Sequence, residues 1–400
     1  MGEKVLMTEW MGQMLQRFGR RSLLLLLVLE LTSCAIPQIK AEDRLFLPLT
    51  AELLDVYTLP SQEFEGTTVG GLSALAYDRP RDRLYTLSDD RGQFGPARFY
   101  TLAISLKRSD PPKFDTVTIT AVTPLLDAEG NPYPQGSIDP EGIALSPRDT
   151  LFIASEGDVR QGAPPFIGEF DRESGRAIAT LPLPARYLPD DPDSPTQGVQ
   201  NNLSLEALTV TGSGGTGMIE PFRLFAATES ALVQDYNDDP SQPLNSRFLH
   251  YLIGDDQTTL IAEHRYPLDL EPSGAVANGL TDLLAIAPAG HFLALERAFG
   301  LRGLQVKLYQ LATGGATDTS TIPSLSGDVS GSSPIRKQLV LDFAETPLAV
   351  ENLEGMTLGP RLPDGSQSLL LVSDNNFEGV RAASQDGTRA TQLILLRLQM

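Results

Sequence analysis

The sequence lacks most of the motifs that mark a nucleophilic, zinc-dependent or nucleotide-binding enzyme. Its 400 residues include one cysteine, one tryptophan and three histidines. A single cysteine excludes an internal disulfide, and no cysteine–histidine group has the spacing of a zinc site. No Gly-x-Ser-x-Gly motif, P-loop or dinucleotide fingerprint occurs. We expect the histidines, His250, His264 and His291, to be structural rather than general bases.

Basic residues are also scarce. Lys and Arg total 31 against 51 Asp and Glu, which gives a formal net charge of −20. This balance argues against a nucleic-acid partner, which requires a basic face. It is compatible with cation binding, and a solvated acidic surface explains it equally well.

The N-terminal residues have the pattern of an export signal. Arg20 and Arg21 precede the apolar run Leu23–Leu29, and Leu31-Thr-Ser-Cys34 follows. A basic region, a short apolar region and small residues are typical of a secretory signal, and the run is too short to span a bilayer as a helix. Leu-Thr-Ser-Cys resembles the bacterial lipobox, so we expect Cys34 to carry lipid. A plain signal peptide with an incidental cysteine is the alternative.

This pattern predicts three regions: a signal over residues 1–34, a short tether over 35–44 and a single domain over 45–400. The protein is then expected to be exported to the periplasm or cell envelope, with contact to the membrane only through the lipid.

A two-part unit recurs five times along the rest of the chain. Its first part is a loop-to-strand step, which carries an acid in four copies: Glu141, Glu206, Asp282 and Glu354. Its second part is an apolar strand that ends in a carboxylate. These second acids are Asp89, Glu156, Glu229, Glu296 and Asp374, at intervals of 67, 73, 67 and 78 residues. Near-constant spacing of this kind indicates a repeat architecture.

Each unit contains four short apolar runs separated by Gly, Pro, Asn and Asp, and the last unit lacks its fourth run. The unused early segment Leu53–Leu59 supplies it. The sequence therefore predicts an all-β fold, a β-propeller of four-stranded blades closed by an N-terminal strand. We count five blades, and a sixth, degenerate one is the alternative. The innermost strands are expected at Leu72–Tyr77, Gly142–Leu145, Leu205–Val210, Leu283–Ala287 and Gly355–Leu358. The Gly-, Ser- and Thr-rich segment Ala312–Ser333 is expected to be a mobile surface loop.

The chain resembles the phytase-like family of secreted bacterial proteins, described as "esterase-like activity of phytase". The resemblance runs from about Val69 to Leu398. It rests on Ser88-Asp89-Asp90-Arg91-Gly92, Asp139-Pro-Glu141-Gly142, Ser155-Glu156-Gly157, Asn352-Leu-Glu354-Gly355 and Ser373-Asp374-Asn375-Asn376. It implies a propeller, export and a metal-dependent hydrolase of phosphate or carboxylic esters.

The repeat itself predicts a cation site. In a propeller the innermost strands direct their ends at a central channel, and carboxylates that converge there repel one another unless a cation neutralises them. Ca²⁺ takes six to eight oxygen ligands in flexible geometry. The candidate ligands are Asp89, Asp90, Glu141, Glu156, Glu354, Asp374 and Asn375, and Arg91 and Arg297 are candidates for binding an anion. Acids at strand ends also cap turns and link blades, which is the structural alternative.

These features together predict an exported, monomeric hydrolase that acts on a small anionic or ester substrate with Ca²⁺ at the channel. The alternative is a non-catalytic propeller that binds a ligand or protein partner at the cell envelope.

Overall fold

Short apolar runs form strands throughout the part of the chain that the structure describes. The computed structural model describes residues 45–399, except 212–219, 256, 271–274, 302, 328 and 378–389. The chain divides into residues 1–45 and a second, compact unit over residues 46–400. The expected signal, Cys34 and the tether lie outside the described residues. No helix among the described residues is long and apolar enough to cross a membrane.

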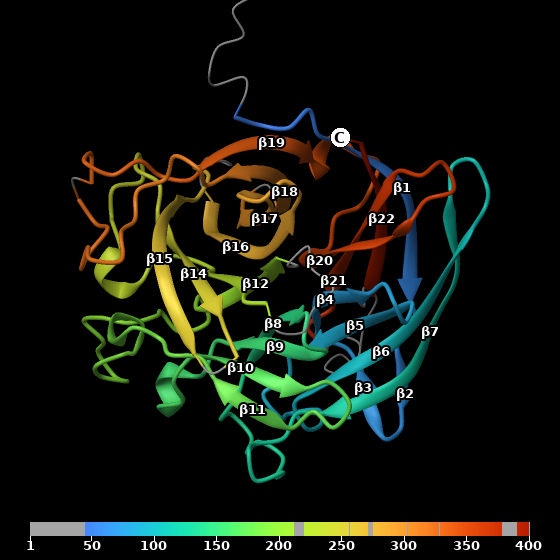
Figure 1. Cartoon of the computed structure of the whole chain (residues 1–400), viewed down its shortest axis with the longest axis horizontal. Coiled ribbons are helices and arrows are strands. Elements are labelled where there is room, and N and C mark those ends of the chain that lie inside the picture. Colours follow the sequence, from blue (N-terminus) through green and yellow to red (C-terminus); the bar gives the residue numbers. More distant parts are fainter. Residues whose placement is uncertain are drawn as a thin grey trace, which may run out of the picture. The chain divides into compact units, whose positions relative to one another are not determined.

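Five antiparallel sheets of four strands form the blades of a propeller (Figure 1). Blade 1 contains β4 (Leu72–Asp78), β5 (Arg83–Ser88), β6 (Arg98–Lys107) and β7 (Lys113–Pro124). Blade 2 contains β8 (Pro140–Leu145), β9 (Thr150–Ser155), β10 (Phe166–Asp171) and β11 (Ala177–Thr180). Blade 3 contains β12 (Leu205–Thr211), β13 (Phe222–Thr228), β14 (Asn245–Ile253) and β15 (Thr258–Pro267).

Blade 4 contains β16 (Ala275–Ile286), β17 (His291–Gly300), β18 (Gly303–Ala312) and β19 (Arg336–Asp342). Blade 5 contains β20 (Asn352–Arg361), β21 (Gln367–Asp374), β22 (Thr391–Gln399) and the N-terminal β1 (Thr50–Leu59). A small hairpin, β2 (Gln62–Phe64) and β3 (Thr67–Val69), links β1 to blade 1. The described residues include four 3₁₀ turns and no α-helix: Val159–Gln161, Ala185–Tyr187, Val233–Asp235 and Phe343–Glu345.

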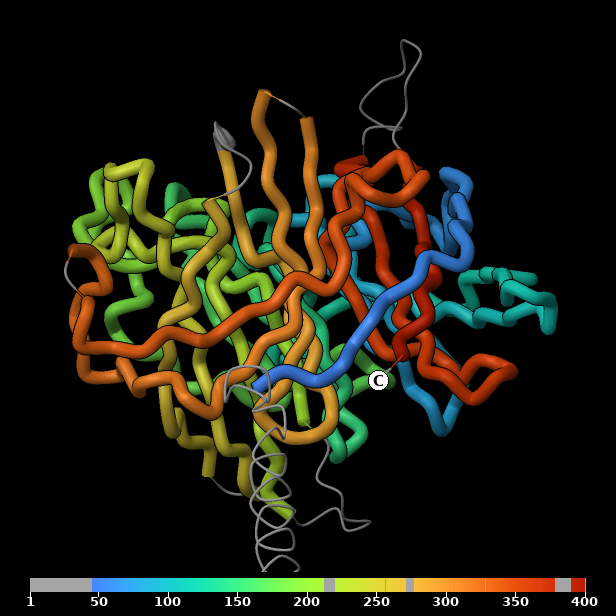
Figure 2. The backbone as a smooth tube through the Cα atoms, turned by 90° about the horizontal axis from the view of Figure 1, so that it is seen from above, coloured from blue at the N-terminus to red at the C-terminus, as the bar shows by residue number. Residues whose placement is uncertain are grey.

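The ring closes as the sequence predicts. The innermost strands β4, β8, β12, β16 and β20 contact one another in that order, and β20 returns to β4 (Figure 1). β1 lies antiparallel to β22, with Thr50 opposite Gln399 and Leu59 opposite Thr391 (Figure 2). Five blades and an N-terminal closing strand are therefore confirmed. β16 begins eight residues before the predicted Leu283.

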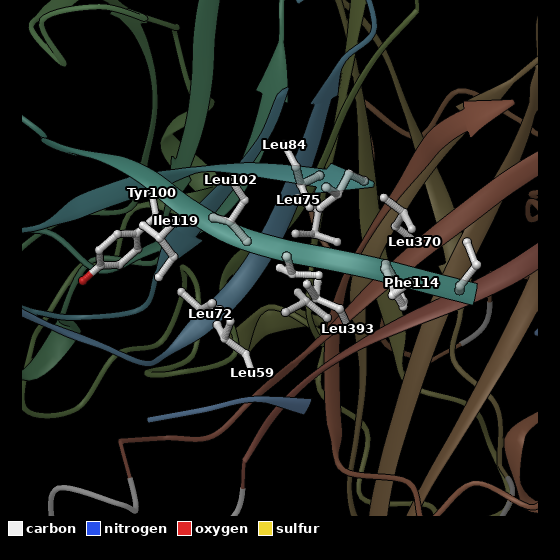
Figure 3. Close-up of a cluster of buried hydrophobic side chains, with 14 of the residues drawn as sticks. Leu59, Leu72, Leu75, Leu84, Tyr100, Leu102, Phe114, Ile119, Leu370 and Leu393 are labelled. Atoms are coloured by element: carbon white, nitrogen blue, oxygen red, sulfur yellow. The ribbon is translucent and has the colours of Figure 1, made fainter. Parts of the chain in front are cut away.

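Apolar side chains from neighbouring blades form the core. Leu75 and Leu84 of blade 1 are in one buried cluster with Leu370 and Leu393 of blade 5 (Figure 3). Full burial of such a side chain contributes about 1.5–3 kcal/mol. β21 is buried along its whole length because blades cover both of its faces.

The segment expected to be a mobile surface loop is a loop, and some of its residues fasten it to blade 3. Thr319 and Leu325 are fully buried, and the carbonyl oxygens of Ile322 and Pro323 accept hydrogen bonds from buried Arg247. The Gly, Ser and Thr content indicated mobility, but these backbone groups satisfy a buried guanidinium.

Candidate functional site

The two parts of the repeat meet at one face of the ring. In blade 2, Pro140 at the start of β8 lies opposite Ser155 at the end of β9, and in blade 5 Asn352 lies opposite Asp374. Antiparallel neighbours place the start of an innermost strand beside the end of the second strand. The channel mouth at this face therefore receives acids from both parts of the repeat.

A β-bulge near the mouth end of each blade changes the direction of one side chain of the innermost strand. This bulge is at the start of the strand in blades 1, 2, 3 and 5 and within β16 in blade 4. The residues skipped by the pairing at these bulges are Ser73, Glu141, Glu206, Thr281 and Glu354. An extra residue in a bulge re-aims its side chain, commonly beside a functional site. Three blades therefore present a glutamate at this position, and the remaining two present a hydroxyl.

Asp282, which the sequence placed in this series, lies one position beyond the bulge. Its buried carboxylate accepts hydrogen bonds from the backbone N–H of Leu283 and of Met356 in the next blade. Asp282 therefore links blades 4 and 5, as the structural alternative proposed for such acids.

The mouth contains a cavity of about 410 Å³. All five blades contribute polar lining, and five of the lining residues are acids: Asp89, Glu141, Glu206, Glu229 and Glu354. A second cavity of about 270 Å³ adjoins it and shares Asp89, Asn202 and Asn376. Here the stacked rings of Phe94 and Phe377 have centroids 4.4 Å apart.

Three carboxylates in the mouth form a group with the geometry of a cation site. One oxygen each of Asp89, Asp139 and Glu141 lies within 4.8 Å of the other two. Asp139 is fully buried, and its Oδ1 accepts no hydrogen bond from a described residue. Its Oδ2 contacts the guanidinium of Arg91. Three hard oxygen donors on one side of a water-accessible cavity suit Ca²⁺ or a similar divalent ion.

Electrostatics also favours a cation here. Burial raises the pKa of Asp89 and of Glu141 well above the ordinary value, and repulsion from neighbouring carboxylates raises each pKa further. Asp139 and Asp374 repel Asp89, while Asp89 and Asp139 repel Glu141. A bound cation would remove this repulsion and favour the ionised carboxylates.

The two arginines predicted to bind an anion are both held by acids. Arg297 Nη2 lies 3.0 Å from Glu229 Oε1, and its Nη1 contacts Glu354 and donates to Asn352 Oδ1 at 2.6 Å. Arg91 contacts Asp139 and donates to Asn202 Oδ1 at 2.6 Å. Arg297 lines the larger cavity and Arg91 the smaller one.

Some predicted ligands have structural partners instead. Asp90 Oδ2 lies 2.7 Å from Arg98 Nη1, and its Oδ1 accepts three backbone N–H groups over residues 92–94. Asn375 Oδ1 accepts the N–H of Gly71 and of Phe377. The structure therefore gives Asp90 and Asn375 roles in holding the loops that frame the mouth.

The other predicted ligands are Glu354, which lines the cavity of the mouth, and Asp374 and Glu156, which are buried and accept backbone hydrogen bonds. Asp374 is buried near Asp89, and its negative charge raises the pKa of Asp89. The Oδ1 atom of Asp374 accepts a hydrogen bond from the N–H of Asn376. Glu156 is buried and accepts the Ser204 N–H of the next blade.

The predicted ligand set omits three acids that the structure places in the mouth or beside it. Asp139 stands two residues before Glu141 in a quoted motif, and its position there was the available signal. Glu206 and Glu229 belong to the repeat and line the cavity. Glu206 Oε2 is buried and has no hydrogen-bond partner among the described residues.

The chain has distant similarity to several solved structures. Among solved structures, the chain is similar to an α-L-arabinofuranosidase catalytic domain from Coprinopsis cinerea, at 10% identity and a TM-score of 0.39, over 88% of this chain and 96% of that chain. An endo-arabinase from Bacteroides thetaiotaomicron matches at 8% identity and a TM-score of 0.41, over 84% of this chain and 98% of that one. At such scores these likenesses carry no argument about function.

A search of curated proteins gives no match. A family model described as "Esterase-like activity of phytase" matches residues 67–377, which span all of blades 1–4 and the mouth-forming strands of blade 5. The chain therefore belongs to the phytase-like family, and its fold is the five-bladed propeller described above.

Proposed function

We propose that the chain is a Ca²⁺-dependent hydrolase of a small phosphate or carboxylic ester, which binds at the channel mouth. The observation that carries this proposal is the group of Asp89, Asp139 and Glu141, with oxygens within 4.8 Å of one another beside the cavity. Family membership supports hydrolysis of an ester. Ca²⁺, when bound, supplies positive charge that polarises a phosphoryl or acyl oxygen.

The charge of the mouth argues for this dependence. Five acids and one arginine line the larger cavity, so the protein alone repels an anionic substrate. A phosphate ester can approach only if a cation offsets these carboxylates. An uncharged carboxylic ester meets no such repulsion, and for it the cation would matter chiefly in the transition state.

Two residues of the mouth have distinct proposed roles. Burial first, and then repulsion from Glu229, raises the pKa of Glu206 well above its ordinary value. Glu206 would therefore hold a proton on its carboxyl group, which lines the cavity and can donate to a leaving-group oxygen. Arg297, fixed by Glu229 and Glu354, would stabilise negative charge that develops on the substrate.

A substrate panel tests the proposal. Phosphomonoester, phosphodiester and carboxylic ester substrates are offered to the full chain after EDTA treatment, and again after Ca²⁺ is restored. We expect turnover of at least one class that EDTA abolishes and Ca²⁺ restores. No turnover of any substrate under either condition would contradict the proposal that the chain is an enzyme and would favour a non-catalytic binding propeller.

The location of the protein remains a separate proposal. We propose that it is exported and anchored at the cell envelope through a lipid on Cys34, where it acts as a monomer. Labelling of cells with a radioactive fatty acid should mark the wild-type chain and leave a Cys34→Ser variant unmarked. Equal labelling of the two chains would show that Cys34 is not the lipidated residue, and light scattering of the purified protein measures its oligomeric state.

A further inference from the structure

A second cleft lies between blades 3 and 4, at the face of the ring opposite the mouth. It has a volume of about 270 Å³. Its lining includes Thr211, the last residue of β12, Arg223 near the start of β13, and Ala289 and Gly290 between β16 and β17. These residues are at the ends of the strands that lie away from the mouth. We name this site the 3–4 cleft.

Aromatic rings form the floor of the 3–4 cleft. Phe225 of β13 lies opposite His250 of β14 in the sheet, and their rings stack with centroids 4.2 Å apart. Phe225 also packs edge-on against Phe292 of blade 4, with centroids 4.7 Å apart. Phe248 is fully buried beside them. This packing fixes the His250 ring at the wall of the cleft.

The polar groups that line the 3–4 cleft come from an arginine, two histidines and two threonines. Arg223 Nη1 lies 2.7 Å from His250 Nε2. Because a guanidinium can only donate, Nε2 accepts this hydrogen bond, and the remaining N–H of the neutral imidazole is at Nδ1. His264 and the hydroxyls of Thr211 and Thr313 complete the polar lining.

Among the described residues, no carboxylate lines the 3–4 cleft, although acids outnumber basic residues 51 to 31 in the whole chain. Within the described part of the chain, Arg223 forms no ion pair, and its side chain lies at the surface. An arginine, two histidines and an aromatic floor without a counter-ion have the chemistry of an anion site.

We propose that the 3–4 cleft binds a small organic anion. Its carboxylate or phosphate group would contact Arg223 and His250, and its apolar part would lie against the Phe225 floor. The burial of His250 and the nearby charges of Arg223 and His264 lower the pKa of His250 to about 4, so a bound anion would also favour protonation of this ring. The site is independent of the mouth and of any metal there.

The three histidines of the chain make the test direct, because each imidazole gives its own nuclear magnetic resonance signals. Signals of the metal-free full chain are assigned with His250→Asn, His264→Asn and His291→Asn variants. Benzoate, acetate and inorganic phosphate are then titrated separately. EDTA is present throughout, so that no metal at the mouth retains the anion.

We expect saturable shifts of the His250 signals with benzoate or phosphate. The affinity should fall about tenfold in Arg223→Gln and stay unchanged in Arg336→Gln, an exposed arginine on β19. Stronger binding of benzoate than of acetate would show that the floor contributes, and the phosphate arm identifies the preferred head group. No saturable shift with any probe, or equal affinities in wild type and Arg223→Gln, would overturn the proposal.

Discussion

The bulged position of each innermost strand separates acids that serve the mouth from acids that hold the ring together. Glu141, Glu206 and Glu354 occupy bulges and line the cavity. Asp282 stands one residue further along its strand and accepts two backbone N–H groups instead. A shift of one residue in a strand turns the side chain to the other face, which explains the different roles of these similar acids.

A Glu206→Gln substitution should separate catalysis from cation binding. It removes the proton that we place on the Glu206 carboxyl group and leaves Asp89, Asp139 and Glu141 in place. Turnover of the best substrate should fall about 100-fold, within the range for a lost general acid, whereas the rise in Tm on adding Ca²⁺ should persist. Glu141→Gln is the matched control and should lose both. Wild-type turnover in Glu206→Gln would contradict the assigned role.

Protonation of His250 should lower stability at acid pH. Its folded-state pKa of about 4 is below the ordinary value of 6.5, because of burial and of Arg223. Between these values the unfolded chain binds a proton that the folded chain does not, so the free energy of unfolding decreases as pH falls from about 6.5 to 4.

The measurement is urea unfolding across that pH range in a buffer without organic anions. His250→Asn should lose less stability than wild type over the range, while the non-titrating control Leu339→Ala should follow wild type. Parallel curves for wild type and His250→Asn would exclude this contribution.

At the scale of single elements, two segments distant in sequence complete blades 5 and 3. β1 supplies the outer strand of blade 5 and buries Leu54 and Leu59. The segment between β18 and β19 covers Arg247, whose fully buried guanidinium lies 2.5 Å from Asp235 Oδ2 and contacts Glu263. Both segments are fastened by groups that would be left unsatisfied without them.

Replacement of Arg247 should destabilise the protein strongly. Arg247→Met leaves the buried carboxylates of Asp235 and Glu263 without their partner, and loss of one member of a buried ion pair costs about 3–5 kcal/mol. Arg336→Met, at an exposed position, should change the free energy of unfolding by no more than about 0.5 kcal/mol. Chemical unfolding of both variants measures the difference, and equal stabilities would contradict a structural role for this ion-pair network.

Removal of β1 should open the ring. A chain that begins at residue 60 loses burial of Leu54 and Leu59, about 3–6 kcal/mol together, and exposes the edge of β22. We expect a fall in Tm of about 10 °C or more, or an aggregated product. A chain that begins at residue 45 keeps β1 and is the control. Equal Tm values for the two chains would show that blade 5 does not need the closing strand.

At the scale of the whole molecule, the fold was predictable because spacing encodes it. Five copies of an apolar run ending at a polar residue, with one strand missing at the end and one spare at the start, specify the number of blades and their closure. The bulges were not predictable in the same way. Their register depends on pairing with the second strand, so the sequence aligned Asp282 with glutamates that it does not match.

The position of the site in the fold was predictable from the sequence, but the full set of residues that could bind the cation was not. Convergence of strand ends correctly placed Asp89, Glu141 and Glu354 at one cavity. The strand-end pattern did not distinguish these three acids from Asp90 and Asn375. In the structure Asp90 pairs with Arg98, and Asn375 accepts hydrogen bonds from backbone N–H groups. Such partners come from residues that are brought together only by folding.

The central claim is that carboxylates from successive blades converge to bind a divalent cation, and a calorimetric titration of Ca²⁺ into the metal-free full chain tests it most directly. We predict saturable binding, which at 100-fold excess over Kd adds about 2.7 kcal/mol to the free energy of unfolding. Binding should be lost in Asp139→Asn and retained in Asp149→Asn, where the acid lies on an outer turn and pairs with Arg81 and Arg172. Absence of saturable binding by the wild-type chain, or equal binding by wild type and Asp139→Asn, would contradict the account.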